Sequence, residues 1–156
     1  ILNMRKQFLL FSTVLLMASL FSTTLQAQWS EAKLQSMYSN FLDGKGYENS
    51  IDGDGDVQFV YNDRTFFIEV NEGDTEFFRV VLANIWPIES VSEGLQVVQA
   101  CDEVNRTMKC TKAYTTNDNV WVALELFVGE PDAFKDVFDR CLTDIELRVS
   151  TFVSVM

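Results

Sequence analysis

The stretch VQFVYNDRTFFIEV, residues 57–70, decides the fold that this sequence predicts. Residues 57–61 and 64–70 are rich in the β-branched and aromatic side chains that favour strands. Between them, Asn62-Asp63 is typical of the two-residue turn of a β-hairpin. The stretch therefore predicts two antiparallel strands joined by a tight turn.

The rest of the chain adds helices and strands on both sides of this hairpin. Helices are predicted where apolar residues recur at three- and four-residue spacing, and strands where runs rich in strand-forming residues end at turn residues. The further predicted elements are helices over about 30–43, 90–107 and from 131 to about 152, and strands over 77–85, 109–115 and 120–128. The order α-β-β-β-α-β-β-α predicts an antiparallel α+β domain with a five-stranded sheet and three helices.

Capping residues and prolines support these boundaries. Ser90 and Glu93 match a capping box, with serine at the cap and glutamate three residues later. Pro131 is favoured in the first turn of the closing helix. Pro87 is expected to end the preceding strand, since proline cannot donate a ladder hydrogen bond.

The predicted register places apolar side chains on both faces of the sheet. A sheet covered on one face alternates between apolar and polar residues, and this one does not alternate cleanly. Either helices flank both faces or a partner covers the second face. On one face of the first hairpin, Phe59 is expected opposite Phe66 and Val57 opposite Ile68, and Val60 and Phe67 are expected on the other face. On one face of the second hairpin, Tyr114 is expected opposite Trp121 and Met108 opposite Phe127. The apolar residues expected on its other face are Val120, Val122, Leu124 and Leu126.

Residues 1–27 have the layout of upstream residues followed by a cleaved secretory signal peptide. Ile1-Leu2-Asn3 precede the start methionine, and Met4-Arg5-Lys6 is a basic head. The uncharged apolar run 8–21 is about 14 residues long, whereas a membrane-spanning helix needs roughly 20. Cleavage is expected after Ala27, which leaves a single domain over 28–156 in the periplasm of a bacterium or outside the cell.

Composition excludes several classes of function. The leader holds two of the 12 basic residues and none of the 23 acidic ones, so residues 28–156 have a net charge of −13. This charge disfavours nucleic-acid binding, which needs clustered Lys and Arg. The sequence has no histidine, which excludes Ser-His-Asp and Cys-His catalysis and histidine-ligated metal sites.

The three cysteines, Cys101, Cys110 and Cys141, lie among apolar neighbours in predicted helices or strands. They are expected to be buried small hydrophobes. The alternative is one disulfide among them, which an exported protein can form, with the third thiol free.

Two acidic motifs suggest chemistry but have structural explanations. Asp52-Gly53-Asp54-Gly55-Asp56 resembles a calcium loop, yet Val57 stands at the sixth position, where a helix-flanked loop needs glycine, so a turn is predicted and no metal. Glu125 lies between two leucines of a strand. It is interpreted as a cross-strand partner of Lys112 rather than a catalytic acid, which normally needs a second carboxylate nearby.

Asn105-Arg106-Thr107 matches an N-glycosylation acceptor. At the end of a predicted helix, Asn105 is expected to cap that helix instead.

In order and spacing, several segments resemble the YbjN-type domain, also called the bacterial sensory transduction regulator family. The resemblance implies the fold of type III secretion chaperones, small acidic dimers that hold other chains through sheet and helix surfaces. It supplies no catalytic residues. The matching segments are Gly46-Tyr47, Asp54 to Phe59, Thr65 to Ile68, Trp86-Pro87-Ile88, Glu103-Val104-Asn105, Lys112-Ala113-Tyr114 and Val120 to Glu125.

The sequence therefore predicts an exported, non-enzymatic module that binds a protein or peptide, without a cofactor, and that forms a homodimer. The alternative is a small-molecule or lipid-binding domain that uses a cleft between sheet and helices. The candidate interaction residues are Phe67 and Trp121, as aromatic anchors, together with Lys112 and Glu125.

Overall fold

The computed structural model describes residues 29–156, so the predicted signal peptide lies outside the described residues. The observed helices are α2 (Glu31–Gly44), α3 (Val91–Thr107), the 3-10 helix η1 (Pro131–Asp136) and α4 (Phe138–Val155). The strands are β1 (Asn49–Ile51), β2 (Val57–Tyr61), β3 (Arg64–Ile68), β4 (Phe77–Pro87), β5 (Thr111–Thr116) and β6 (Asn119–Phe127). None of these helices combines the length and the apolar character that crossing a membrane requires.

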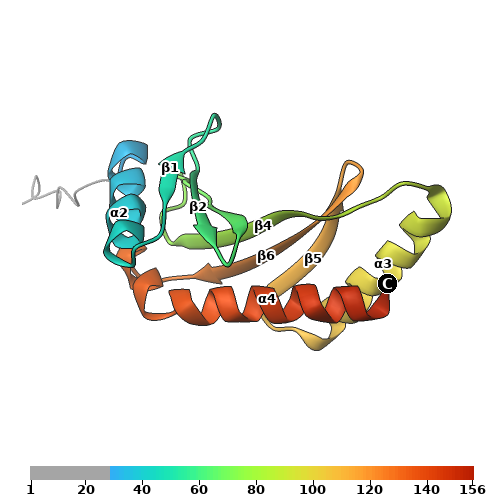
Figure 1. Ribbon diagram of the computed structural model, residues 1–156. Helices are drawn as coiled ribbons and strands as arrows, with labels where there is room; N and C mark the ends of the chain where they lie inside the picture. Colours follow the sequence, from blue (N-terminus) through green and yellow to red (C-terminus); the bar gives the residue numbers. More distant parts are fainter. Residues whose placement is uncertain (1–28) are drawn as a thin grey trace, which may run out of the picture.

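The strands form one antiparallel sheet in the order β1-β2-β3-β4-β6-β5 (Figure 1). The antiparallel α+β class is confirmed, but the prediction of five strands is wrong because the sheet has six. The missed strand β1 has the sequence Asn-Ser-Ile, which lacks a strand pattern of its own. It pairs with β2 through the turn at 52–56, so its strand conformation depends on its neighbour.

The register within both hairpins agrees with the sequence except at one end. Phe59 lies opposite Phe66, and Tyr114 lies opposite Trp121. In the β2–β3 turn both Asn62 and Asp63 have positive φ, as a type I′ turn requires. The predicted pairing of Met108 with Phe127 is wrong, because Met108 is the C-cap of α3 and β5 begins only at Thr111.

The helices close one face of the sheet. Figure 1 shows α4 along one side of the sheet, α2 beside β1 and α3 near the end of β5. The core joins apolar residues of α2, α3, η1 and α4 to alternate residues of β2, β3, β4, β5 and β6. The closing helix does not start at Pro131 as a single α-helix, because η1 comes first and Val137 separates it from α4.

Candidate functional site

The two faces of the sheet differ in what covers them. On the inner face the large side chains are almost fully buried against the helices, as Phe66, Val80 and Val122 show. On the opposite face, Val81 and Ala123 are also buried, at 4% and 0% exposure, but they do not belong to the core cluster. We call this second surface the outer face. Its residues lie on β3 to β6, apart from Glu69, which directly follows β3. They are Phe67, Glu69, Arg79, Val81, Lys112, Tyr114, Trp121, Ala123 and Glu125.

A row of paired residues crosses the outer face. Phe67 lies opposite Val81, Val81 opposite Ala123, and Ala123 opposite Lys112. Phe67 is half-buried, whereas Val81 and Ala123 in the middle of the row are buried, at 4% and 0% exposure. None of these three residues belongs to the core cluster that the helices of residues 29–156 help to form.

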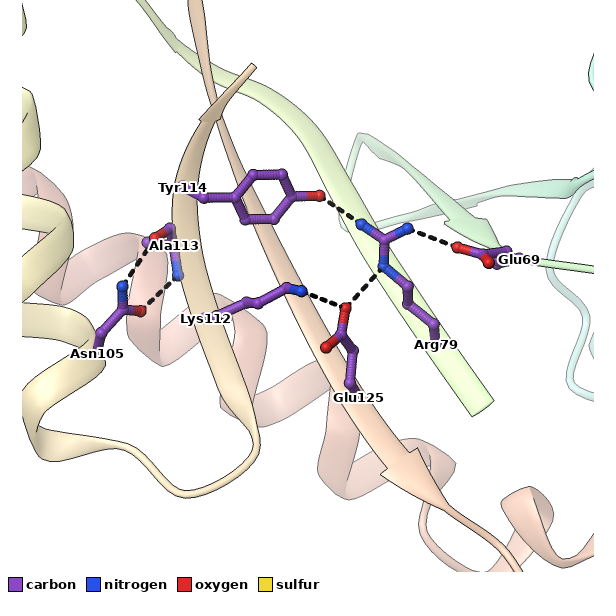
Figure 2. A network of polar contacts seen from close by, with 7 residues as sticks. All are labelled: Glu69, Arg79, Asn105, Lys112, Ala113, Tyr114 and Glu125. Carbon is purple, nitrogen blue, oxygen red and sulfur yellow. Dashed lines mark hydrogen bonds and ion pairs between the residues drawn. The ribbon is translucent and has the colours of Figure 1, made fainter. Parts of the chain in front are cut away.

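Beside this row, four charged side chains form a chain of ion pairs (Figure 2). Arg79 Nη1 lies 2.5 Å from Glu69 Oε2, and Arg79 Nε lies 3.0 Å from Glu125 Oε1. Lys112 Nζ lies 2.6 Å from the same Glu125 oxygen. Arg79 Nη2 also donates a hydrogen bond of 2.5 Å to the hydroxyl oxygen of Tyr114. With two acids and two bases, the network is electrically neutral although the protein as a whole is strongly acidic.

Arg79 is the centre of this network, and its partners stabilise its charged form. Burial by itself would lower the pKa of Arg79, but the hydrogen bond to Glu69 and the nearby acidic groups raise it above its usual value. Because Arg79 stands between Glu69 and Glu125, each of these carboxylates already has a cationic partner. This arrangement favours a structural role for Glu125 over that of a general acid.

The structure places all four predicted interaction residues on the outer face. The expected Lys112–Glu125 pair is present, and it is part of a larger network. Trp121 is half-buried, and its indole Nε1 donates to Asn84 Oδ1 at 3.1 Å. Sequence reasoning missed Arg79 and the hydroxyl of Tyr114. The signal available was a single arginine inside the otherwise apolar segment 77–82.

A side chain of α3 forms hydrogen bonds with the backbone of a central residue of the edge strand β5. The Asn105 side chain accepts from Ala113 N at 2.8 Å and donates to Ala113 O at 3.0 Å (Figure 2). Asn105 thus makes the two hydrogen bonds that a neighbouring strand would make, and does not cap α3 with its side chain as expected. It blocks this point of the edge against an added strand.

The aspartate-rich loop forms a turn between β1 and β2. Asp52 Oδ1 accepts from Asp54 N at 2.9 Å and from Asp56 N at 3.0 Å, and Asp56 Oδ1 accepts from Val70 N at 2.9 Å. Gly55 has a φ of +93°, which favours glycine at this position. These contacts support the turn interpretation. Within residues 29–156, the structure contains no group of three or more Cys, Asp or Glu side chains arranged to hold a metal.

The three cysteines are free thiols, but they differ in exposure. Cys101 and Cys141 are buried, and burial raises the pKa of each thiol to about 11. Cys110 is exposed, so the expectation of burial is wrong for it. It directly precedes β5, and its backbone carbonyl accepts a hydrogen bond from Glu125 N at 3.1 Å.

Two further surface features lie away from the outer face. An apolar stripe on α3 consists of Val91, Leu95 and Val98, all exposed and on one side of the helix. A pocket of about 410 Å³ lies between α4, the inner side of β6 and the segment 107–110.

The family model YbjN, described as "Putative bacterial sensory transduction regulator", matches residues 37–155. The chain belongs to the YbjN family. Membership indicates a regulatory or binding module, and the match covers every helix and strand except the first turns of α2.

One solved structure supports the fold of this YbjN-family chain. The crystal structure of YbjN, "a putative transcription regulator from E. coli", matches with a TM-score of 0.55 at 14% identity, over 74% of this chain and 87% of that one. The type III secretion chaperone SycH of Yersinia pestis, in complex with a stable fragment of YscM2, matches with a TM-score of 0.40 at 13% identity, over 70% of this chain and 98% of that one. No curated protein matches the chain.

Proposed function

We propose that this YbjN-family chain is an exported, non-enzymatic binding module that holds a protein or peptide on its outer face, and that the protein held there is a second copy of the chain, in a homodimer. The observation that supports the proposal best is the outer face itself. It presents half-buried Phe67 and Trp121 around a neutral ion-pair network, and no helix of residues 29–156 packs its core side chains there.

Charge favours this face over the rest of the surface for self-association. Two copies that each have a net charge of −13 over residues 28–156 repel one another at long range. The four charges of the outer-face network cancel, so repulsion is weakest where this face meets its copy. Because each charge already has a partner, covering the network leaves no charged group unpaired.

Large aromatic side chains supply the binding energy in this proposal. Trp and Tyr dominate many interfaces because they bury much area and keep a polar group for hydrogen bonding. Trp121 already uses its indole N–H on Asn84, so its ring can be covered without losing a hydrogen bond. Phe67 supplies a second anchor on β3.

The absence of histidine from the sequence and the pairing of Glu69 and Glu125 with cations support a non-enzymatic role. The family description as a regulator is consistent with action through binding.

Export is the part of the proposal that depends on the leader. A basic head followed by an apolar run of about 14 residues supports secretion rather than a membrane anchor. Mass spectrometry of the exported protein should find its first residue near Gln28. A mature mass that retains residues 8–21 would instead indicate an anchored protein.

Photo-crosslinking tests the outer face directly. A photoreactive phenylalanine analogue at position 121 should give adducts with a second copy or with a protein partner. The same analogue at Leu147, an exposed apolar position on α4, is the matched control and should give few adducts. Equal yields at the two positions would contradict the proposal.

A further inference from the structure

The pocket at the carboxyl end of β6 combines apolar walls with cationic side chains. Leu124 and Leu126 extend into it from the inner side of β6, and Val137 and Met108 close it from the start of α4 and the end of α3. Its volume of about 410 Å³ lies within the range of small-molecule sites, roughly 300–1,000 Å³. These walls can accommodate a short hydrocarbon body.

Three cations and one acid line the same pocket. They are Lys109, Arg140, Arg148 and Asp144. Asp144 is already engaged, because Arg148 Nη2 donates to it at 2.8 Å and the Thr111 hydroxyl donates to its other oxygen. Lys109 and Arg140, by contrast, form no ion pair with any side chain of residues 29–156.

This excess of positive charge is unusual in a chain with a net charge of −11. Of the ten cationic side chains in residues 29–156, six form ion pairs and four do not. Two of those four, Lys109 and Arg140, line this one pocket. Elsewhere the acidic surface opposes the approach of an anion. Two cations without ion pairs beside apolar walls therefore favour a ligand that has both an anionic group and an apolar part.

We propose that this pocket binds a small amphipathic monocarboxylate. Its hydrocarbon part lies against Met108, Leu124 and Leu126, and its carboxylate pairs with Arg140 and Lys109. Arginine and lysine both form charge-assisted hydrogen bonds with a carboxylate, and the apolar walls add the burial of the hydrocarbon part. Asp144 disfavours a dianion or a second acidic group beside it, because it is itself negatively charged.

The pocket contains its own reporter of occupancy. Cys110 is the exposed thiol of the three and lines the pocket, whereas Cys101 and Cys141 are buried. A bound carboxylate should therefore slow the alkylation of Cys110 in particular. The rate is measured at this residue by peptide mass spectrometry after treatment of the purified protein with iodoacetamide.

The decisive comparison uses three ligands of equal chain length on the unaltered protein. Octanoate should slow the alkylation of Cys110 in a saturable manner, and octanol and octylammonium should bind at least about tenfold more weakly because they lack the carboxylate. Equal protection by octanol would overturn the proposal, since it would show that the pocket selects for apolar bulk alone. No protection by octanoate would also overturn it.

Variants then test the named cations. Arg140→Gln and Lys109→Gln should each weaken octanoate binding by about tenfold while leaving octanol binding unchanged. Lys33→Gln, which removes a cation from α2 far from the pocket residues in the chain, is the matched control for net charge. An octanoate affinity that is the same in Arg140→Gln and in Lys33→Gln would contradict the assignment. None of these changes touches the outer face, so this result is independent of the dimer proposal.

Discussion

Replacing Arg79 with methionine should destabilise the domain by about 2 kcal/mol. The change keeps a long side chain but removes the cation that pairs with Glu69 and Glu125 and donates to Tyr114. Glu69 then has no ion pair with any residue that the structure describes, whereas Glu125 keeps Lys112.

The magnitude follows from the exposure of the three side chains. Exposed pairs contribute about 0.2–1 kcal/mol, whereas removing one partner of a fully buried pair costs about 3–5 kcal/mol. The side chains of Arg79, Glu69 and Glu125 are 22%, 30% and 24% exposed, which lies between these two cases. The expected loss is therefore intermediate.

Urea denaturation followed by circular dichroism measures the free energy of unfolding. Arg106→Met is the matched control, because Arg106 pairs with Glu103 at the surface with 65% and 40% exposure. Its loss should cost less than about 0.5 kcal/mol. The double variant Arg79→Met with Glu69→Met should recover part of the lost stability, since it no longer leaves the Glu69 carboxylate without its cation.

An equal loss of stability in Arg79→Met and Arg106→Met would contradict this expectation. That result would mean that solvent screens the outer-face network like any surface pair. Glu69 and Glu125 would then not need Arg79, and their assignment to a structural role would lose its support.

Three other outcomes are expected. Asn105→Ala should destabilise the domain by about 1–3 kcal/mol in urea denaturation, because it leaves Ala113 N–H and C=O without their partner. Asn105→Asp should not restore this stability, because a carboxylate accepts from Ala113 N–H but cannot donate to Ala113 C=O; a neutral Asn105→Ala would refute the edge-blocking role. Burial by itself would raise the pKa of Asp144, but hydrogen bonds from Arg148 and Thr111 hold it below its usual value, so its contribution to stability is complete above about pH 4 and is lost as the pH falls through the lower, folded-state pKa. Thermal unfolding of Asp144→Asn should accordingly depend less on pH below about pH 4 than that of the unaltered protein, and identical profiles would contradict this. Millimolar calcium should leave the melting temperature unchanged, whereas a site occupied at a hundredfold above its dissociation constant would add about 2.7 kcal/mol; a rise that Asp54→Asn with Asp56→Asn abolishes would restore the metal interpretation.

Local sequence patterns predicted the hairpins because the information for each lies within a few residues. The turn at Asn62-Asp63 and the alternation on either side specify the β2–β3 register without reference to the rest of the chain. The same locality accounts for the Lys112–Glu125 pair, which follows from the β5–β6 hairpin. Strand β1 was missed because its three residues become a strand only through pairing with β2.

The centre of the outer-face network could not be predicted for a different reason. Arg79 meets Glu125 because β4 pairs with β6, and α3 and β5 lie between these strands in the sequence. Nothing local in residues 77–87 specifies that partner. The exposure of Cys110 was missed because β5 begins only at Thr111, so Cys110 lies in the α3–β5 connection and not in the strand that was predicted to bury it.

A double substitution on the outer face tests whether two copies associate through this surface or through the exposed apolar stripe on α3. Phe67→Ser with Trp121→Ser removes the two aromatic anchors, while Leu95→Ser with Val98→Ser removes most of the apolar stripe on α3. Both pairs replace partly exposed side chains, so both variants should retain the circular dichroism spectrum of the folded domain. They differ only in which surface loses its apolar character.

Light scattering across a concentration series up to high micromolar tests the central claim most directly. The unaltered exported form should have the mass of a dimer, the outer-face variant that of a monomer, and the α3 variant that of a dimer. A monomer at every concentration of the unaltered protein, or a dimer that survives in the outer-face variant but not in the α3 variant, would contradict association through the outer face.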